Sequence, residues 1–168
     1  NLYYISLMSL TTILIRKGLD HISLLGSNII SNSKFIFVSA NGYNIYNGQI
    51  IVYYNKVTIN SNELNIHSII YSPEKFNSNF GLTASVNEDY LVVGAISYNV
   101  YHGAVYIYKF KHNKWIYMQK LLHENDKHIP VFGDNIKIND NNYLAISDNK
   151  SIYIYELDSS LDKFIYKT

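Results

Sequence analysis

The chain has 168 residues, of which 48% are hydrophobic and 16% are charged, with a formal net charge of +1 and no cysteine. This length is enough to bury one core, and the composition is that of a folded protein rather than a disordered one. The small net charge gives no electrostatic reason to expect nucleic acid or an anionic membrane as partner, and the lack of cysteine excludes disulfides, thiolate metal sites and cysteine nucleophiles.

The opening stretch, NLYYISLMSLTTILI, carries no charge. It contains many polar groups, is shorter than the ~20 residues of a membrane-spanning helix, and lacks the basic leader and cleavage site of a signal peptide. We therefore predict no membrane insertion, and we interpret the stretch as the end of one strand followed by another, TTILI, at residues 11–15. Because residue 1 is Asn rather than Met, we expect the chain to be processed or to be part of a longer polypeptide.

The next feature is a repeat with a period of about 50 residues. Its first marker is a residue pair ending in glycine, at Leu25-Gly26, Phe80-Gly81 and Phe132-Gly133. Strand-like segments lie at similar offsets behind each pair: FIFVSA (35–40), YLVVGA (90–95) and YLAIS (143–147), and then GQIIVYY (48–54), GAVYIYK (103–109) and KSIYIYE (150–156). The interval from Gly26 to Gly48 equals that from Gly81 to Gly103. Such a period is typical of β-propeller blades rather than of helical solenoids.

Each unit is predicted to contain four short strands. In the middle unit these are LTASV, YLVVGA, GAVYIYKF and KWIYMQKLL, separated by turn sequences such as VNED and KHNK. Alternating polarity and abundant aromatic and β-branched residues favour strands, and no segment has a helical period. We predict an all-β chain of about three propeller blades, each with four antiparallel strands. The approximate boundaries are 1–56, 57–111 and 112–158, with 159–168 beginning a further blade.

This pattern resembles the FG-GAP repeat, which builds the seven-bladed propeller of integrin α subunits and of many surface proteins. The resemblance covers nearly the whole chain. The middle unit carries it best: Phe80-Gly81, Gly94-Ala95, Gly103 and Trp115. The first unit has Leu25 and Ser39 in place of Phe and Gly, and the third has Ile146-Ser147 in place of Gly-Ala. The resemblance implies structural roles for these residues and their counterparts Gly26, Gly48, Phe132 and Gly133, because glycine permits tight bends and close backbone approach.

The resemblance also implies an extracellular, cell-surface or virion-associated protein. Three blades leave open faces, so we expect further blades of the same polypeptide, or further copies of the chain, to complete a ring. Many family members carry a calcium loop between the first and second strands. The corresponding turns here, SNSK (31–34), VNED (86–89) and NDNN (139–142), are too short to surround an ion. We therefore predict no metal and no cofactor, and the six histidines show no metal-ligand spacing.

Two loops are the candidate binding elements, because residues 43–48 and 98–103 share the pattern Tyr-Asn-x-Tyr-x-Gly. In the family, loops at this position lie on the face that binds partners, and tyrosine suits interfaces. The candidate binding residues are Tyr43, Asn44, Tyr46, Tyr98, Asn99, Tyr101 and His102. The alternative is that the tyrosines pack the loops between neighbouring blades, which the repetition favours. The charged run HENDKH, at 123–128, is expected to be a solvated loop, or else a second partner contact.

No catalytic motif is present: the sequence has no nucleophile elbow, Walker loop or Gly-x-Gly-x-x-Gly fingerprint, and no repeated sialidase turn. We predict no catalytic residues and a non-catalytic module that binds a protein or surface ligand, as part of a larger surface or secreted protein. The alternatives are a purely structural module of a larger assembly such as a virion, and an enzyme acting at the central channel of a propeller. The abundance of Asn, Ile, Tyr and Lys indicates an AT-rich coding sequence and says nothing about function.

Overall fold

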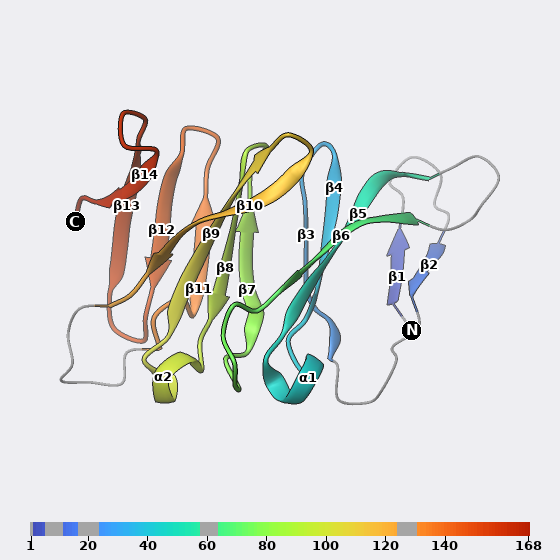
Figure 1. The fold of residues 1–168 in the computed structure, drawn as a ribbon, viewed down its shortest axis with the longest axis horizontal. Helices are drawn as coiled ribbons and strands as arrows, with labels where there is room; N and C mark the ends of the chain where they lie inside the picture. The colour runs from blue at the N-terminus through green and yellow to red at the C-terminus, as the bar shows by residue number, and fades with distance from the viewer. Residues whose placement is uncertain (1, 6–11, 17–23, 58–63, 124–130) are drawn as a thin grey trace.

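In the computed structural model, the described residues are 2–5, 12–16, 24–57, 64–123 and 131–168. These residues form three four-stranded antiparallel sheets and one two-stranded sheet (Figure 1), which confirms the predicted all-β class and the four-stranded units. The two-stranded sheet is formed by β1 (Leu2–Ile5) and β2 (Thr12–Arg16). No helix among the described residues is long and apolar enough to span a membrane.

In each large sheet the strands follow one another in chain order. The first sheet contains β3 (Leu25–Ser31), β4 (Phe35–Ala40), β5 (Gln49–Val57) and β6 (Leu64–Tyr71). The second contains β7 (Phe80–Val86), β8 (Tyr90–Ala95), β9 (Ala104–Lys111) and β10 (Lys114–Leu121). The third contains β11 (Asn135–Ile138), β12 (Tyr143–Ser147), β13 (Ile152–Asp158) and β14 (Lys163–Tyr166). Two short elements, α1 (Tyr43–Tyr46) and α2 (Tyr98–Tyr101), connect the second and third strands of the first two sheets.

The observed sheets therefore span 25–71, 80–121 and 135–166, and their limits differ from the expected boundaries of 1–56, 57–111 and 112–158. Each sheet includes the strand that closes its own hairpin, and this strand lies beyond the expected limit. Residues 163–166, expected to begin a further blade, instead form the fourth strand of the third sheet, where Tyr166 pairs with Tyr155. The connection is a tight turn in which the Asp158 carboxylate accepts backbone hydrogen bonds from Ser160 and Leu161, so the chain returns at once to β13.

In the first two units, the glycine of the repeated pair lies at a bulge in the first strand. In β7 the pairing with β8 changes register between Phe80 and Ala84, and Gly81 has a φ of +93°. In β3 the register changes between Leu25 and Ile29, and Gly26 has a φ of +88°. Glycine adopts this conformation without the penalty that a side chain would incur, and the bulge twists the strand.

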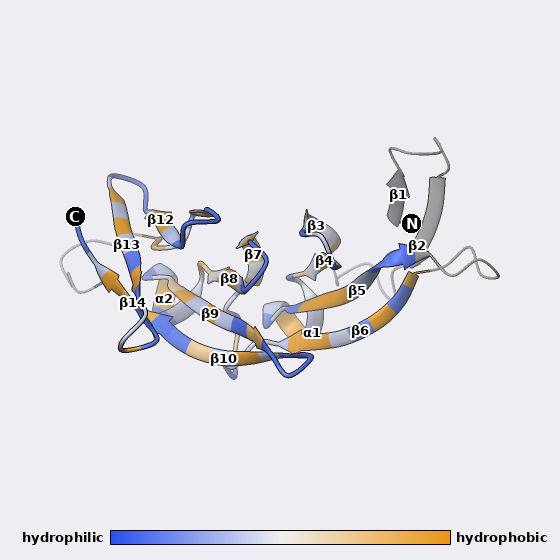
Figure 2. Ribbon diagram, turned by 90° about the horizontal axis from the view of Figure 1, so that it is seen from above, coloured by the Kyte–Doolittle hydropathy of each residue, from blue (hydrophilic) through white to orange (hydrophobic). Residues whose placement is uncertain are grey.

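The sheets stand side by side along an arc, with β3 and β7 on its concave side and β6 and β10 on its convex side (Figure 2). We use the word seam for the contact between two neighbouring sheets. The central strands are buried on both faces: in β4, Phe35 and Phe37 pack into the first seam, whereas Ile36 and Val38 belong to a cluster on the opposite face. The middle sheet has a neighbour on each side, which explains why its strand β8 is buried along its whole length.

Candidate functional site

The two candidate loops form α1 and α2, which lie on the same edge of the sheets (Figure 1). Each is a single turn in which three successive non-glycine residues have positive φ: Asn44, Ile45 and Tyr46 in α1, and Asn99, Val100 and Tyr101 in α2. This left-handed backbone costs roughly 1–2 kcal/mol per residue, and it is rare for branched residues such as Ile45 and Val100. Both turns are therefore strained and have to be held by contacts outside the turn.

Those contacts come from the next sheet. In α1, the carbonyl of Tyr46 accepts a hydrogen bond from the Asn79 N–H at 2.8 Å, and the carbonyl of Asn47 accepts one from Phe80 at 3.2 Å. A β-carbon added to Gly48 would lie 2.1 Å from the Phe80 carbonyl oxygen, so only glycine allows this approach. The first turn is thereby docked, through its backbone, onto the Phe-Gly pair of the following unit.

The second turn repeats this arrangement. The carbonyl of Tyr101 accepts from Val131 at 3.1 Å, and that of His102 accepts from Phe132 at 3.0 Å. A β-carbon on Gly103 would again lie 2.1 Å from the next carbonyl oxygen, that of Phe132. The backbone of both loops therefore belongs to the seams between sheets.

The side chains of the two turns divide into two groups. Tyr43 and Tyr98, which open the turns, are half-buried, and His102 contacts the Asn99 carbonyl of its own turn. The remaining predicted residues Asn44, Tyr46, Asn99 and Tyr101 are exposed at the tips. Two further tip residues, missed by the sequence analysis, are strongly exposed: Ile45 is 81% and Val100 is 74% accessible. Their common position inside the Tyr-Asn-x-Tyr-x-Gly pattern was the available signal.

Tyr98 belongs to a charged cluster that fixes the 72–79 connection on the second sheet. The Lys120 Nζ lies 2.8 Å from Glu74 Oε1 and 3.5 Å from the centre of the Tyr98 ring, and the Tyr106 hydroxyl donates to the same carboxylate. Burial alone would raise the pKa of Glu74, but the hydrogen bonds from Lys120 and Tyr106 outweigh it and hold that pKa below its usual value. Burial and the Glu74 contact raise the pKa of Tyr106, so its phenol remains protonated. Every charge in this cluster has a partner, which favours a structural role.

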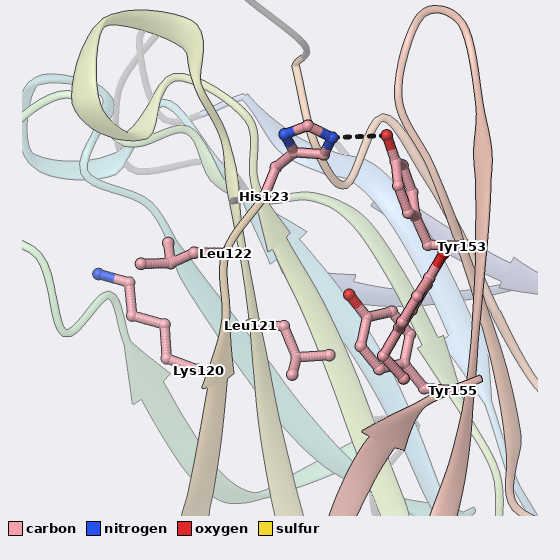
Figure 3. Close-up of a pocket in the computed structure, with 7 residues that line it drawn as sticks. Lys120, Leu121, Leu122, His123, Tyr153 and Tyr155 are labelled. Carbon is pink, nitrogen blue, oxygen red and sulfur yellow. Dashed lines mark hydrogen bonds between the residues drawn. The ribbon is translucent and has the colours of Figure 1, made fainter. Parts of the chain in front are cut away.

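A cavity of about 580 Å³ opens between the end of β10 and strands β13 and β14 (Figure 3). Its lining residues are Lys120, Leu121, Leu122, His123, Tyr153, Tyr155 and Tyr166. Leu121 points toward Tyr155, whereas the amine of Lys120 points away from the tyrosines. The volume is in the range of small-molecule sites, but the lining combines apolar and phenolic groups without a charged group directed inward.

The polar end of this cavity is a chain of hydrogen bonds. His123 Nε2 lies 2.6 Å from the Tyr153 hydroxyl, which donates to Asp148 Oδ2 at 2.9 Å. Burial would raise the pKa of Asp148, but backbone N–H groups of Lys150 and Ser151, with the Tyr153 hydroxyl, hold it below its usual value. Burial raises the pKa of Tyr153, so this phenol acts as a hydrogen-bonding group rather than as an ionised nucleophile. Of the charged run 123–128 only His123 is placed here, because 124–130 lie outside the described residues.

The remaining residues assigned structural roles lie in the seams. Phe80 and Phe132 are fully buried, and the buried Ala95 belongs to the core of the first seam. The position of Gly94 in β8 leaves no room for a side chain, since a β-carbon there would lie 2.8 Å from the Gly133 carbonyl oxygen. Trp115 packs across the first seam with its ring centre 5.3 Å from that of Phe37.

No cluster of three or more His, Asp or Glu side chains with metal-site geometry occurs in the part of the chain that the structure describes.

The fold and the edge turns define a class, an all-β protein of stacked four-stranded antiparallel sheets. Comparison with known proteins adds no relative, since no family model and no curated protein matches the chain.

Proposed function

We propose that the chain is a segment of an FG-GAP-type β-propeller and acts as a non-catalytic binding module for a protein or surface ligand, in an extracellular, cell-surface or virion-associated setting. Stacked four-stranded antiparallel sheets related by a sequence repeat support the propeller architecture. The observation that carries the binding role is the pair of strained turns whose exposed branched side chains, Ile45 and Val100, occupy the same position in successive units.

Backbone strain at exposed positions supports this binding role. A connection between two strands does not require three left-handed residues, and Asn or Gly would satisfy that backbone at lower cost than Ile or Val. Neither exposed side chain adds buried apolar area that would offset the strain within the chain. Together with Tyr46 and Tyr101, they present apolar and aromatic groups on rigid supports, which is the composition of protein-binding hot spots.

The alternative is a purely structural module, and one observation favours it: the carbonyls of Tyr46, Asn47, Tyr101 and His102 are all occupied in the seams. The two functions place demands on different atoms. A structural role requires the turn backbone, whereas recognition requires the exposed side chains. Substitutions that keep the backbone and change the tips therefore separate them.

The decisive variant is the double substitution Ile45→Asn and Val100→Asn. Asparagine tolerates positive φ, so thermal stability should stay equal or rise, while the apolar tips are lost. The probe is a random peptide library displayed on phage, selected in parallel on immobilised wild-type and variant chains. The matched control is Ile116→Asn, which changes an exposed isoleucine on β10.

If the chain is a binding module for protein ligands, wild type and Ile116→Asn should enrich the same peptides, and the double variant should lose them by at least about tenfold. Equal enrichment by the double variant would show that the tips are not the recognition surface. If the wild type enriches no peptides, the structural alternative is favoured.

A further inference from the structure

Two adjoining cavities open in the first seam, on the edge of the sheets opposite α1 and α2. The β3–β4 and β9–β10 turns, which contribute residues to them, lie on that edge in Figure 1. The larger cavity has a volume of about 620 Å³ and the smaller about 390 Å³, and Tyr54 and Asn113 line both. Each volume is in the range of small-molecule sites, and two cavities in a row suit an extended ligand.

Tyr54 presents an open aromatic ring where the two cavities meet. It is 38% accessible, and its ring centre lies 5.7 Å from that of Phe35 and 5.1 Å from that of His67. His67 Nε2 donates to the Asn113 carbonyl at 3.2 Å, which ties the first sheet to the β9–β10 turn of the second. The Tyr54 ring is therefore held in place by its neighbours while part of it stays open to a ligand.

The charge of the lining is one-sided. Lys34, Lys56 and Lys114 line the cavities, and the described lining residues include no carboxylate. None of these lysines forms an ion pair within the described residues, and Glu88, beside the larger cavity, accepts instead from the N–H and the hydroxyl of Ser33. In the whole chain, 14 basic residues nearly balance 13 acidic ones, so the positive excess is local. The cavities therefore favour a negatively charged ligand.

Neutral hydrogen-bonding groups lie in the same lining. Asn65 and Asn113 are exposed, and neither side-chain amide makes a hydrogen bond within the described part of the chain. An amide both donates and accepts, which matches the hydroxyl groups of a ligand. A bare anion would not use the Tyr54 ring, and a hydrocarbon would leave the amides and lysines unpaired. A ligand with an apolar ring face, hydroxyl groups at its rim and negative charge would use all three features, and an acidic sugar has this chemistry.

Single-stranded nucleic acid fits this lining less well. It binds to successive aromatic rings on which neighbouring bases stack. Tyr54 is the one exposed ring among the described aromatic residues of the two cavities, because Phe35 is buried and His67, Phe110 and Trp115 are half-buried. One open ring accommodates one sugar and leaves the rest of the ligand to polar contacts.

We propose that the two cavities form a binding site for an acidic oligosaccharide, with one sugar ring on Tyr54 and its carboxylate or sulfate groups bound by Lys34, Lys56 and Lys114. The site lies on the edge opposite the tips of α1 and α2 and does not depend on what those tips bind.

The test is a fluorescence titration, because the single tryptophan of the chain, Trp115, lines the smaller cavity. The probes are a short heparin oligosaccharide, which carries sulfate, and a short oligomer of galacturonic acid, which carries carboxylate. A malto-oligosaccharide is the uncharged comparison, and oligothymidylate is the nucleic acid comparison. At least one acidic saccharide should change the emission in a saturable manner, with an affinity that falls as salt is added. No saturable change with either acidic saccharide, equal affinity for the malto-oligosaccharide or tighter binding of oligothymidylate overturns the proposal.

A pair of double variants separates the site from general attraction between charges. Lys34→Gln with Lys114→Gln should weaken binding of the acidic saccharide by at least about tenfold. The matched control, Lys150→Gln with Lys163→Gln, changes the net charge equally at exposed lysines of the third sheet and should bind as wild type does. Circular dichroism should be unchanged in both, because all four lysines are exposed. Equal weakening in the two double variants would show that net charge alone attracts the saccharide, and it would overturn the site.

A third variant tests the ring. Tyr54→Leu keeps an apolar side chain against Phe35 and removes the aromatic face, so it should weaken binding about fivefold at every salt concentration. The control Tyr143→Leu, at an exposed tyrosine of the third sheet, should leave the affinity unchanged. A Tyr54→Leu chain that binds the saccharide as tightly as wild type does would contradict the placement of a sugar on this ring.

Discussion

Replacing Gly48 by alanine should destabilise the chain much more than replacing Gly81, although both glycines have nearly the same backbone conformation. Their φ values are +89° and +93°, so each substitution incurs the left-handed penalty of roughly 1–2 kcal/mol. The difference lies in what the new methyl group meets. At position 48 it would lie 2.1 Å from the Phe80 carbonyl oxygen, whereas at 81 the nearest atom is Ser39 Oγ at 3.3 Å.

The magnitude follows from the contacts that have to open. A methyl group at position 48 forces apart the seam that contains two backbone hydrogen bonds, from Asn79 to Tyr46 and from Phe80 to Asn47. Each is worth about 1 kcal/mol. We therefore expect Gly48→Ala to lower the free energy of unfolding by about 3–4 kcal/mol and Gly81→Ala by about 1–2 kcal/mol.

The assay is urea unfolding of both variants and wild type, followed by circular dichroism at a fixed low protein concentration. Gly103→Ala provides an internal repeat, because its φ is +78° and its methyl group would meet the Phe132 carbonyl oxygen at the same 2.1 Å. It should match Gly48→Ala. Equal losses of stability in Gly48→Ala and Gly81→Ala would contradict this prediction, since close approach between sheets would then contribute nothing beyond backbone strain.

Two further predictions concern the second seam. Because the pKa of Asp148 is held below 3.8 in the folded chain, its stabilising effect is present above that pH and is lost as the pH falls through the folded pKa. The stability difference between wild type and Asp148→Asn should therefore shrink on acidification in urea titrations, and a difference that stays constant well below pH 3.8 would contradict this. Gln119 bridges the seam by donating to the Phe164 carbonyl at 3.0 Å and accepting from its N–H at 2.9 Å. Gln119→Glu removes the donor and places a carboxylate oxygen against that carbonyl, so it should cost about 1–3 kcal/mol; an unchanged thermal midpoint would refute the bridge.

The four-stranded units were predictable because their signals are local. Alternating apolar residues specify a strand, and glycine before or after it specifies a bend, so three copies of one pattern sufficed to predict three similar sheets. The asparagine contacts between units, in which Asn32 Nδ2 donates to the Asn87 carbonyl and Asn87 Nδ2 to the Asn139 carbonyl, had a sequence signal too. All three asparagines keep a constant offset from the repeat glycines. This signal was not distinctive, because asparagine is common in turns even where its side chain contacts no neighbouring unit.

The conformations of α1 and α2 could not be predicted in this way. Nothing in the local sequence favours a left-handed backbone at Ile45 or Val100. That backbone is held because carbonyls of each turn accept hydrogen bonds from N–H groups of the next unit. The bond from Asn79 to Tyr46, for example, joins residues more than thirty positions apart in the chain. The cavity could not be predicted from local sequence either, since its lining residues Leu121 and Tyr153 come from different sheets. The repeat alone determined the kind of sheet and its number of strands. Which glycines make close contacts and which side chains form the tips were decided by the stacking of the sheets, because those properties belong to pairs of sheets and not to any one of them.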